Sequence, residues 1–156
     1  MFSLYQKYNK LKIVDFRYEY KKLKNKVYRV KNKNRLSIGW GNHDGELTCD
    51  WISDRRWLHR VDGPAQIVCL NVGTGFVKPP FIYEIVWYEH GKRHRVGGPA
   101  RIEYYTEEDQ EVWTWYMNGW AHRIDGPAQI WKNSSNGSIL KENWYLNGEL
   151  QQTINY

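Results

Sequence analysis

The amino-acid sequence predicts an all-β protein, an array of antiparallel β-hairpin repeats preceded by a basic N-terminal segment. A nine-residue block, His-Arg-Val-Asp-Gly-Pro-Ala-Gln-Ile at 59–67, returns with small changes at 94–102 and 122–130. Nine Trp and twelve Tyr in 156 residues favour a core built from aromatic side chains more than from Leu. Recurrence at a near-constant interval is typical of one supersecondary unit stacked so that each copy covers a face of its neighbour.

The N-terminal segment, residues 1–36, differs in charge from the array expected over 37–156. It carries 12 Lys or Arg against two acidic residues, whereas the rest of the chain carries 11 against 15. Alternating apolar and charged residues over 14–21 predict a half-buried strand, and 27–30 reads as its return strand in a basic hairpin. A helix over 4–13 is the alternative, because its apolar residues share one helical face.

Each repeat begins with a Trp-Tyr pair that runs into a tight turn, which we call the head of the repeat. Trp87, Trp115 and Trp144 are each followed by Tyr and, four residues after the Trp, by Gly. Two of these turns are Asn-Gly, a pair that favours a type I′ hairpin because both central residues take a positive φ. We therefore expect these three Trp residues to have a structural role in the repeat.

The His-Arg block comes after the head and ends in a Gly-Pro bend that sets where the next strand begins. His94 and His122 each lie seven residues after the head Trp. The first copy is irregular, because Trp51 precedes its His by eight residues, and the last copy has Gln151-Gln152 in place of His-Arg. Such degeneration is expected of a terminal repeat that caps an array.

The repeat resembles the MORN repeat, a tandem β-hairpin unit with an aromatic residue and an Asn-Gly turn. The fuller pattern W-Y-x-N-G-x-x-H-R-x-D-G-P-A, found over residues 51–150, is similar to a MORN-related variant of phage, giant-virus and bacterial proteins. It departs from the ordinary MORN unit in its length and in its His-Arg-x-Asp-Gly-Pro block. The resemblance implies an elongated, curved antiparallel sheet used for protein contacts, dimerisation or acidic lipids, and a phage or viral source.

Three histidines at equivalent positions raise the question of a metal site. His59, His94 and His122 are expected about 9 to 10 Å apart, because successive units are separated by two strand spacings of about 4.8 Å. Ligands of one metal ion must converge to about 2 Å from it, so neither a metal site nor a cofactor is expected. Each His is instead expected to bond to the backbone or a carboxylate of a neighbouring repeat.

The arginine after each His is expected to hold the Gly-Pro bend. Arg60 and Arg123 have Asp62 and Asp125 two residues later, and such pairs form charge-assisted contacts. Arg95 has a Gly at that place, which predicts that it is freer to meet an external anion. An alternative interpretation has all these guanidinium groups facing outward between Trp side chains, where they would bind bases and phosphates.

Two sets of residues are candidates for binding. Tryptophan and arginine dominate the energy of many protein interfaces, so the candidates for contact with a partner are Arg93, Arg95, Arg101, Trp57 and Trp120. The candidates for attracting a polyanion lie in the basic segment and are Lys21, Lys22, Lys24 and Lys26.

These features favour a non-catalytic module that binds a macromolecular partner, with a protein as the first choice. A viral source would make it an inhibitor or adaptor of a host complex. One alternative is a protein that binds nucleic acid or a nucleotide through the Lys-rich segment and an Arg/Trp face. The other is a structural protein that associates with itself through an edge of its sheet.

Catalytic and targeting signals do not stand out in the sequence. The His-Arg block occurs three times, twice with the Asp of His-Arg-x-Asp, without the glycine loop of a kinase, and no nucleophile motif is present, so an enzyme is not expected. No stretch is long and apolar enough to span a membrane, and the first residues lack the apolar core of an export signal. We therefore expect a cytoplasmic protein, in the host cytoplasm if it is viral.

Overall fold

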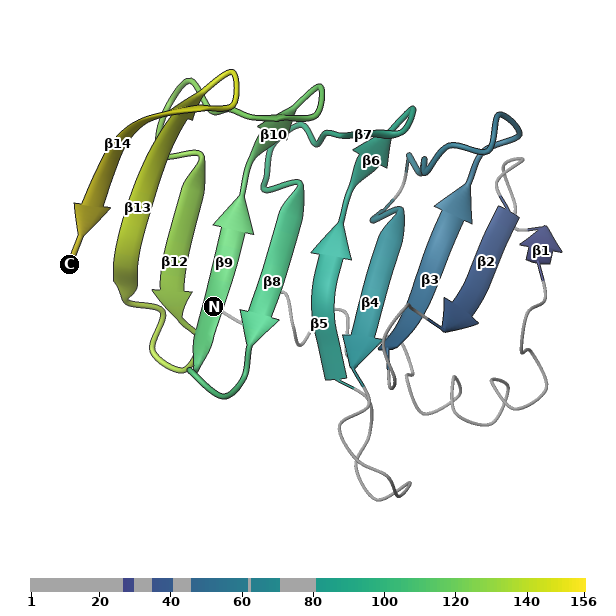
Figure 1. The fold of residues 1–156 in the computed structure, drawn as a ribbon, viewed down its shortest axis with the longest axis horizontal. Helices are drawn as coiled ribbons and strands as arrows, with labels where there is room; N and C mark the ends of the chain where they lie inside the picture. The colour runs from purple at the N-terminus through teal and green to yellow at the C-terminus, as the bar shows by residue number, and fades with distance from the viewer. Residues whose placement is uncertain (1–26, 30–34, 41–45, 62, 71–80) are drawn as a thin grey trace.

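A computed structural model describes residues 27–29, 35–40, 46–61, 63–70 and 81–156, and in these residues the fold is all-β with no helix (Figure 1). Ten strands form the main sheet: β1 (Val27–Arg29), β2 (Arg35–Trp40), β3 (Glu46–Ile52), β4 (Gln66–Leu70), β5 (Phe81–Val86), β8 (Arg101–Tyr105), β9 (Gln110–Thr114), β12 (Gln129–Asn133), β13 (Ile139–Leu146) and β14 (Glu149–Asn155). Four short strands form two further hairpins: β6 (Tyr88–Glu89) with β7 (Lys92–Arg93), and β10 (Tyr116–Met117) with β11 (Trp120–Ala121).

The main sheet is antiparallel throughout and follows the order of the chain, β1-β2-β3-β4-β5-β8-β9-β12-β13-β14. The two short hairpins interrupt this order without entering the sheet, because each continues a long strand beyond its end (Figure 1). The predicted array of antiparallel hairpins is confirmed.

The sheet crosses the predicted boundary at residue 36. β1 and the start of β2 both precede residue 37, and β1 pairs with β2. β1 falls within the return strand predicted over 27–30, but the strand described beside it is β2. The strand predicted over 14–21, the alternative helix over 4–13 and the four candidate lysines lie outside the described residues.

Apolar side chains form a row across the middle of the sheet on one of its faces. Ile67, Ile85 and Ile102 are cross-strand neighbours on β4, β5 and β8. Ile85 and Ile102 are fully buried, and the row continues to the buried Cys49 on β3 and to Trp113 on β9. The alternation of apolar and polar residues along each strand is what places these side chains on a common face.

The heads adopt the expected turn geometry. Both central residues of each turn have a positive φ, as a type I′ hairpin requires, at His90 (48°) and Gly91 (78°), Asn118 (54°) and Gly119 (95°), and Asn147 (50°) and Gly148 (89°). In the irregular first copy, Arg56 takes the positive φ instead, at 63°.

The last repeat differs from the others in its return path. In the earlier copies, the Gly-Pro bend takes the chain away from the head before the next sheet strand begins. The last copy has Asn155-Tyr156 where Gly-Pro would stand, and β14 continues beside β13 as far as Asn155. β14 is therefore the edge strand at the C-terminal end of the sheet (Figure 1).

Candidate functional site

The heads and their return bends stand side by side along one edge of the sheet, the upper edge in Figure 1. We call this surface the head edge and define it as residues 51–61, 87–99, 115–127 and 144–152. Most of the residues that the sequence singled out lie on it.

Each head is fastened to the repeat before it by two backbone donors. The turn glycines donate their N–H groups to the carbonyl just before the preceding His: Gly91 to Leu58, Gly119 to Arg93 and Gly148 to Ala121, each at 2.9 Å. The residue before each glycine donates its N–H to Nδ1 of that same His: His90 to His59 at 3.3 Å, Asn118 to His94 at 3.3 Å and Asn147 to His122 at 3.2 Å. Every described His of the block thus links its own repeat to the next.

The side chains next to the block histidines differ between His59 and His94. His90 occupies the turn position that Asn fills in the later heads, and its ring stacks on His59 with 4.5 Å between ring centres. His94 instead has the carboxylate of Glu89 at 3.6 Å from its Nε2. Within the described residues, no group of three or more His, Cys, Asp or Glu side chains could hold a metal ion.

The arginine of each block lies over the indole of its own repeat. The distance from the guanidinium carbon to the ring centre is 4.4 Å for Arg60 over Trp51, 3.9 Å for Arg95 over Trp87 and 4.3 Å for Arg123 over Trp115. Each arginine also donates from Nη1 to the proline carbonyl of its bend: Pro64 at 3.5 Å, Pro99 at 3.1 Å and Pro127 at 3.5 Å. A Cβ on the glycine before each proline would lie 3.0 to 3.1 Å from the guanidinium carbon, so a larger residue would crowd the stack.

This geometry overturns the interpretation of an outward row of cations between Trp side chains. Trp87 is buried within the core, and the ring of Trp115 is covered by its arginine. A planar guanidinium gains both stacking and a carbonyl acceptor by folding onto the indole, which explains its inward position. Arg95 also folds onto the indole of its own repeat, although the residue two positions later is Gly97, with a φ of 78°, and not an acid.

At the third block, the arginine pairs with the aspartate two residues after it, as the sequence predicts. Arg123 donates from Nε to Asp125 at 3.0 Å, and this hydrogen bond lowers the pKa of the Asp125 carboxyl. Asp62 lies outside the described residues. Trp144, the head Trp of the last repeat, has no arginine over it in the described part of the chain, because Gln152 stands at the arginine position.

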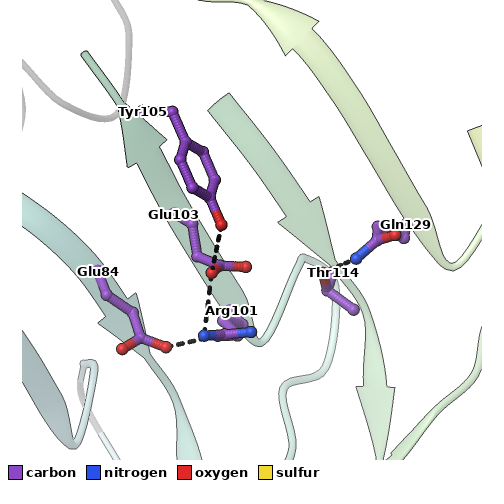
Figure 2. Close-up of polar contacts among 6 residues, drawn as sticks. All are labelled: Glu84, Arg101, Glu103, Tyr105, Thr114 and Gln129. Carbon is purple, nitrogen blue, oxygen red and sulfur yellow. Dashed lines mark hydrogen bonds and ion pairs between the residues drawn. The ribbon is translucent and has the colours of Figure 1, made fainter. Parts of the chain in front are cut away.

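Arg101 is the first residue of β8, just beyond the head edge, and belongs to a polar cluster on the sheet strands (Figure 2). It pairs with Glu84 through Nε and with Glu103 through Nη2 at 3.0 Å, and the hydroxyl of Tyr105 donates to Glu103 at 3.0 Å. Burial raises the pKa of Glu103 against the lowering effect of Arg101, and burial together with Glu103 raises the pKa of Tyr105. Arg101 is therefore balanced by carboxylates of its own chain and is not a free cation for a partner.

The same face carries a neutral ladder further along the sheet. Gln129 donates to Thr114 at 3.4 Å, Asn143 donates to Gln129 at 2.7 Å, and Thr153 donates to Asn143 at 2.8 Å. Thr114 and Asn143 are buried, so these bonds satisfy polar groups that water does not reach.

A regular row of aliphatic side chains stands exposed on the head edge. Val61, Val96 and Ile124 are 87%, 89% and 83% exposed. All three fill the variable position of the His-Arg-x-Asp-Gly-Pro block, so they recur at the same point of three successive bends. The sequence does carry a signal for this row, because the same position of all three polar bends is aliphatic. Sequence reasoning missed this signal because the repeat pattern treats that position as variable.

Other large apolar side chains add to this row. Of ten exposed large hydrophobic residues in the described chain, eight lie on the head edge: Trp57, Val61, Val96, Met117, Trp120, Ile124, Leu146 and Leu150. Among the predicted partner-contact residues, Trp57 (45% exposed) and Trp120 (63% exposed) belong to this surface. Arg93 is half-buried, with its guanidinium carbon 5.4 Å from the Tyr116 ring centre.

Charge is unevenly distributed along the head edge. The first bend, 53–63, carries three arginines against two aspartates, and the second, 88–98, carries three cations against one glutamate. The third, 116–126, is balanced, and 145–152 has a single glutamate. The N-terminal half of the head edge is therefore cationic, whereas the C-terminal half is apolar and close to neutral.

The chain matches no protein-family model, no curated protein and no solved structure. In the described residues, no helix is long and apolar enough to cross a membrane.

Proposed function

We propose that this protein is a non-catalytic scaffold that binds a protein partner along the head edge. The observation that carries the proposal is the row of Val61, Val96 and Ile124. A single exposed aliphatic residue is ordinary on a protein surface, but exposed aliphatic residues at three equivalent positions form a regular apolar row. Full burial of such a side chain by a partner contributes about 1.5 to 3 kcal/mol, before the cost of association.

The repeat spacing limits the shape of the partner segment. Equivalent residues of adjacent two-stranded units are about 9.5 Å apart, given a strand spacing near 4.8 Å. A polyproline II segment has three residues per turn and advances about 9.3 Å in three residues, so every third side chain returns to the same face. A partner segment of that conformation along the head edge would therefore place an apolar side chain at every third residue opposite the aliphatic row.

The two exposed tryptophans give this surface its anchors. Trp57 packs against the turn of the second head, where a Cβ on Gly91 would lie 3.5 Å from it, and Trp120 packs in the same way against Gly148. Both indoles are thus held in place by the next repeat while a large part of each stays exposed. Rigid, half-exposed Trp side chains are favoured at interface hot spots because little conformational freedom is lost on binding.

Site-specific photo-crosslinking tests this proposal. A photoreactive residue at position 96 should give a protein adduct in lysate, and the adduct should disappear in the Val61→Ser, Ile124→Ser background. The matched control places the same residue at position 107, an exposed site in the turn between β8 and β9. Equal adducts from 96 and 107, or none from 96, would contradict the proposal.

A nucleic-acid partner is the second candidate, and the cationic half of the head edge favours it. Arg55, Arg56 and Lys92 are exposed around Trp57, with the guanidinium carbon of Arg55 5.9 Å from the Trp57 ring centre. Cations beside an accessible aromatic ring suit phosphates and stacked bases. Fluorescence anisotropy with single- and double-stranded nucleic acid, at low and physiological salt, tests this candidate.

Two variants separate the possible anion sites in that measurement. Arg55→Ser, Arg56→Ser, Lys92→Ser removes the exposed cations of the head edge, and a second variant changes Lys21, Lys22, Lys24 and Lys26 to Ser. Phosphate contacts predict weaker binding and a shallower salt dependence for whichever set is used. Binding that neither variant changes would reject both sets.

A further inference from the structure

We infer that β14 pairs with β14 of a second copy of this chain, in antiparallel orientation about a two-fold axis near Thr153. The inference does not depend on the proposed function, because it concerns the edge of the sheet and not the exposed row on the heads. It rests on the free backbone groups of β14, on its side chains and on the way in which the last repeat departs from the others.

β14 is exposed along almost its whole length. Six of its seven residues are exposed, and only Ile154 is half-buried. Beyond the strand, Tyr156 N–H donates to the Leu140 carbonyl at 3.0 Å, which makes Lys141 and Asn155 a pair without mutual hydrogen bonds. By alternation, the N–H and C=O groups of Asn155 and Thr153 point away from β13, to the side where the described sheet has no further strand.

The side chains of β14 do little to prevent edge pairing. Natural edge strands are usually protected by Lys, Pro or short length. β14 is seven residues long, reads Glu-Leu-Gln-Gln-Thr-Ile-Asn and has a single charged residue at its first position. One register irregularity toward β13, next to Trp144, is the only such protective feature in it.

A second copy fits this edge without a clash of charge. In an antiparallel pair centred on Thr153, each Thr153 N–H meets the Thr153 carbonyl of the other copy. Gln152 then lies opposite Ile154, and Gln151 lies opposite Asn155. Glu149 falls outside these pairs, so like charges do not meet, and a Thr-Thr pair at the centre favours a sheet.

The repeat rules argue against a head-to-tail extension at this end. In the three earlier junctions, a His accepts a hydrogen bond from the next head, whereas the last copy has Gln151 there, and Gln151 donates its side-chain amide to the Glu149 carbonyl. The link that would receive another head is thus changed, and the chain forms an edge strand there instead. In an antiparallel two-fold pair the two sheets form one continuous sheet, and the head edges of the two copies lie along its opposite long edges.

Light scattering after size-exclusion chromatography, over a range of concentrations, tests the inference on the full chain. The mass should rise with concentration from 18.8 kDa toward twice that value and stop there. A single pair of strands buries less than the roughly 1,200 Å² of a standard interface, so the association should be weak and the series should extend to high concentration. A monomer at every concentration would overturn the inference, as would growth beyond the dimer.

Two pairs of variants locate the contact. Thr153→Pro removes the central donor and should abolish the dimer, whereas Thr153→Val loses only the side-chain bond to Asn143 and should keep it. Gln152→Lys places like charges beside the axis and should also give a monomer, with Gln152→Ser as its control. If Thr153→Pro does not fold, Gln152→Lys alone decides, and a dimer that persists in Gln152→Lys would reject the two-fold pair.

Discussion

The second repeat and the last repeat share a head but differ in the segment that comes after it. After the head of β6 and β7, Arg95 lies over Trp87, His94 receives the next head and the chain leaves through a Gly-Pro bend. After the last head, Gln151 and Gln152 take the places of His and Arg, and the chain continues as β14. The same type of Trp-Tyr head therefore leads either to another repeat or to an edge strand.

Because the two heads are alike, the difference in the path of the chain after them lies with the block after the head. Three contacts depend on that block: the arginine on the indole, the His that receives the next turn and the bend whose proline carbonyl the arginine binds. Removal of each contact in turn should therefore destabilise the second repeat, while the equivalent change in the last repeat should cost little.

The largest effect is expected from Trp87→Ala. Trp87 is buried in the core and carries Arg95, so its removal leaves a cavity and an arginine without its ring. The free energy of unfolding should fall by about 3 to 5 kcal/mol, as is usual for a buried Trp. Urea unfolding measures it, and Trp144→Ala, at the head Trp of the last repeat, is the comparison. Equal losses would show that the two heads do not differ in this way.

A smaller loss is expected from Arg95→Ala. The change removes a stacked cation and the bond to Pro99, worth together about 1 to 2 kcal/mol. Arg95→Lys should recover only part of it, because an ammonium group lacks the planar face that stacks on Trp87. Gln152→Ala, at the equivalent position, should stay within about 0.5 kcal/mol of the parent in the same unfolding experiment. A full recovery in Arg95→Lys would mean that charge alone matters.

Most of the fold could be predicted from the sequence, because repetition aligns equivalent residues without any structure. The type I′ turns, the departure of Gln151 from the His position and the antiparallel order all follow from spacing and turn chemistry. The pairing partner of β1 and the length of the last strand could not be predicted from the sequence. Both depend on which strand edge is unpaired, and the alternation of apolar and polar residues along a strand does not show which edge that is.

The candidate site was predicted less well than the fold. Trp57 and Trp120 were chosen by residue type and lie exposed, but Arg95 and Arg101 were chosen by charge and have partners within the chain. A sequence shows that a cation is present but not whether an indole or a carboxylate of another strand lies against it. The exposure of Val96 is likewise set by the direction of the bend, which only the structure shows.

His94→Ala should cost about 1 kcal/mol, the usual net value of one hydrogen bond. The change removes the Nδ1 acceptor of the Asn118 N–H and leaves the Gly119 bond to the Arg93 carbonyl in place. Hydrogen exchange should therefore become faster at the Asn118 amide, with a smaller change at Gly119. Gln151→Ala should alter neither amide, because its side-chain amide donates to the Glu149 carbonyl in the last repeat. Unchanged exchange at Asn118 would show that the His does not hold the junction.

The smallest effect compares the charged cluster of β5 and β8 with the neutral ladder that reaches β14. Burial raises the pKa of Glu103 in the folded protein above the ordinary value of 4.5, so the folded state binds this proton more tightly than the unfolded state. Its contribution to stability is then fully present below that value and is lost as the pH rises and Glu103 ionises in the fold.

Glu103→Gln removes this dependence, so its stability relative to the parent should improve, by about 1 kcal/mol or less, between about pH 4 and pH 7. Asn143→Ser in the neutral ladder should instead lose the same amount at both pH values, because only hydrogen bonds to Gln129 and Thr153 are involved. Urea unfolding at the two pH values measures both variants. A constant difference for Glu103→Gln would mean that Arg101 offsets the burial of the carboxylate completely, and the two halves of the polar face would then respond to pH alike.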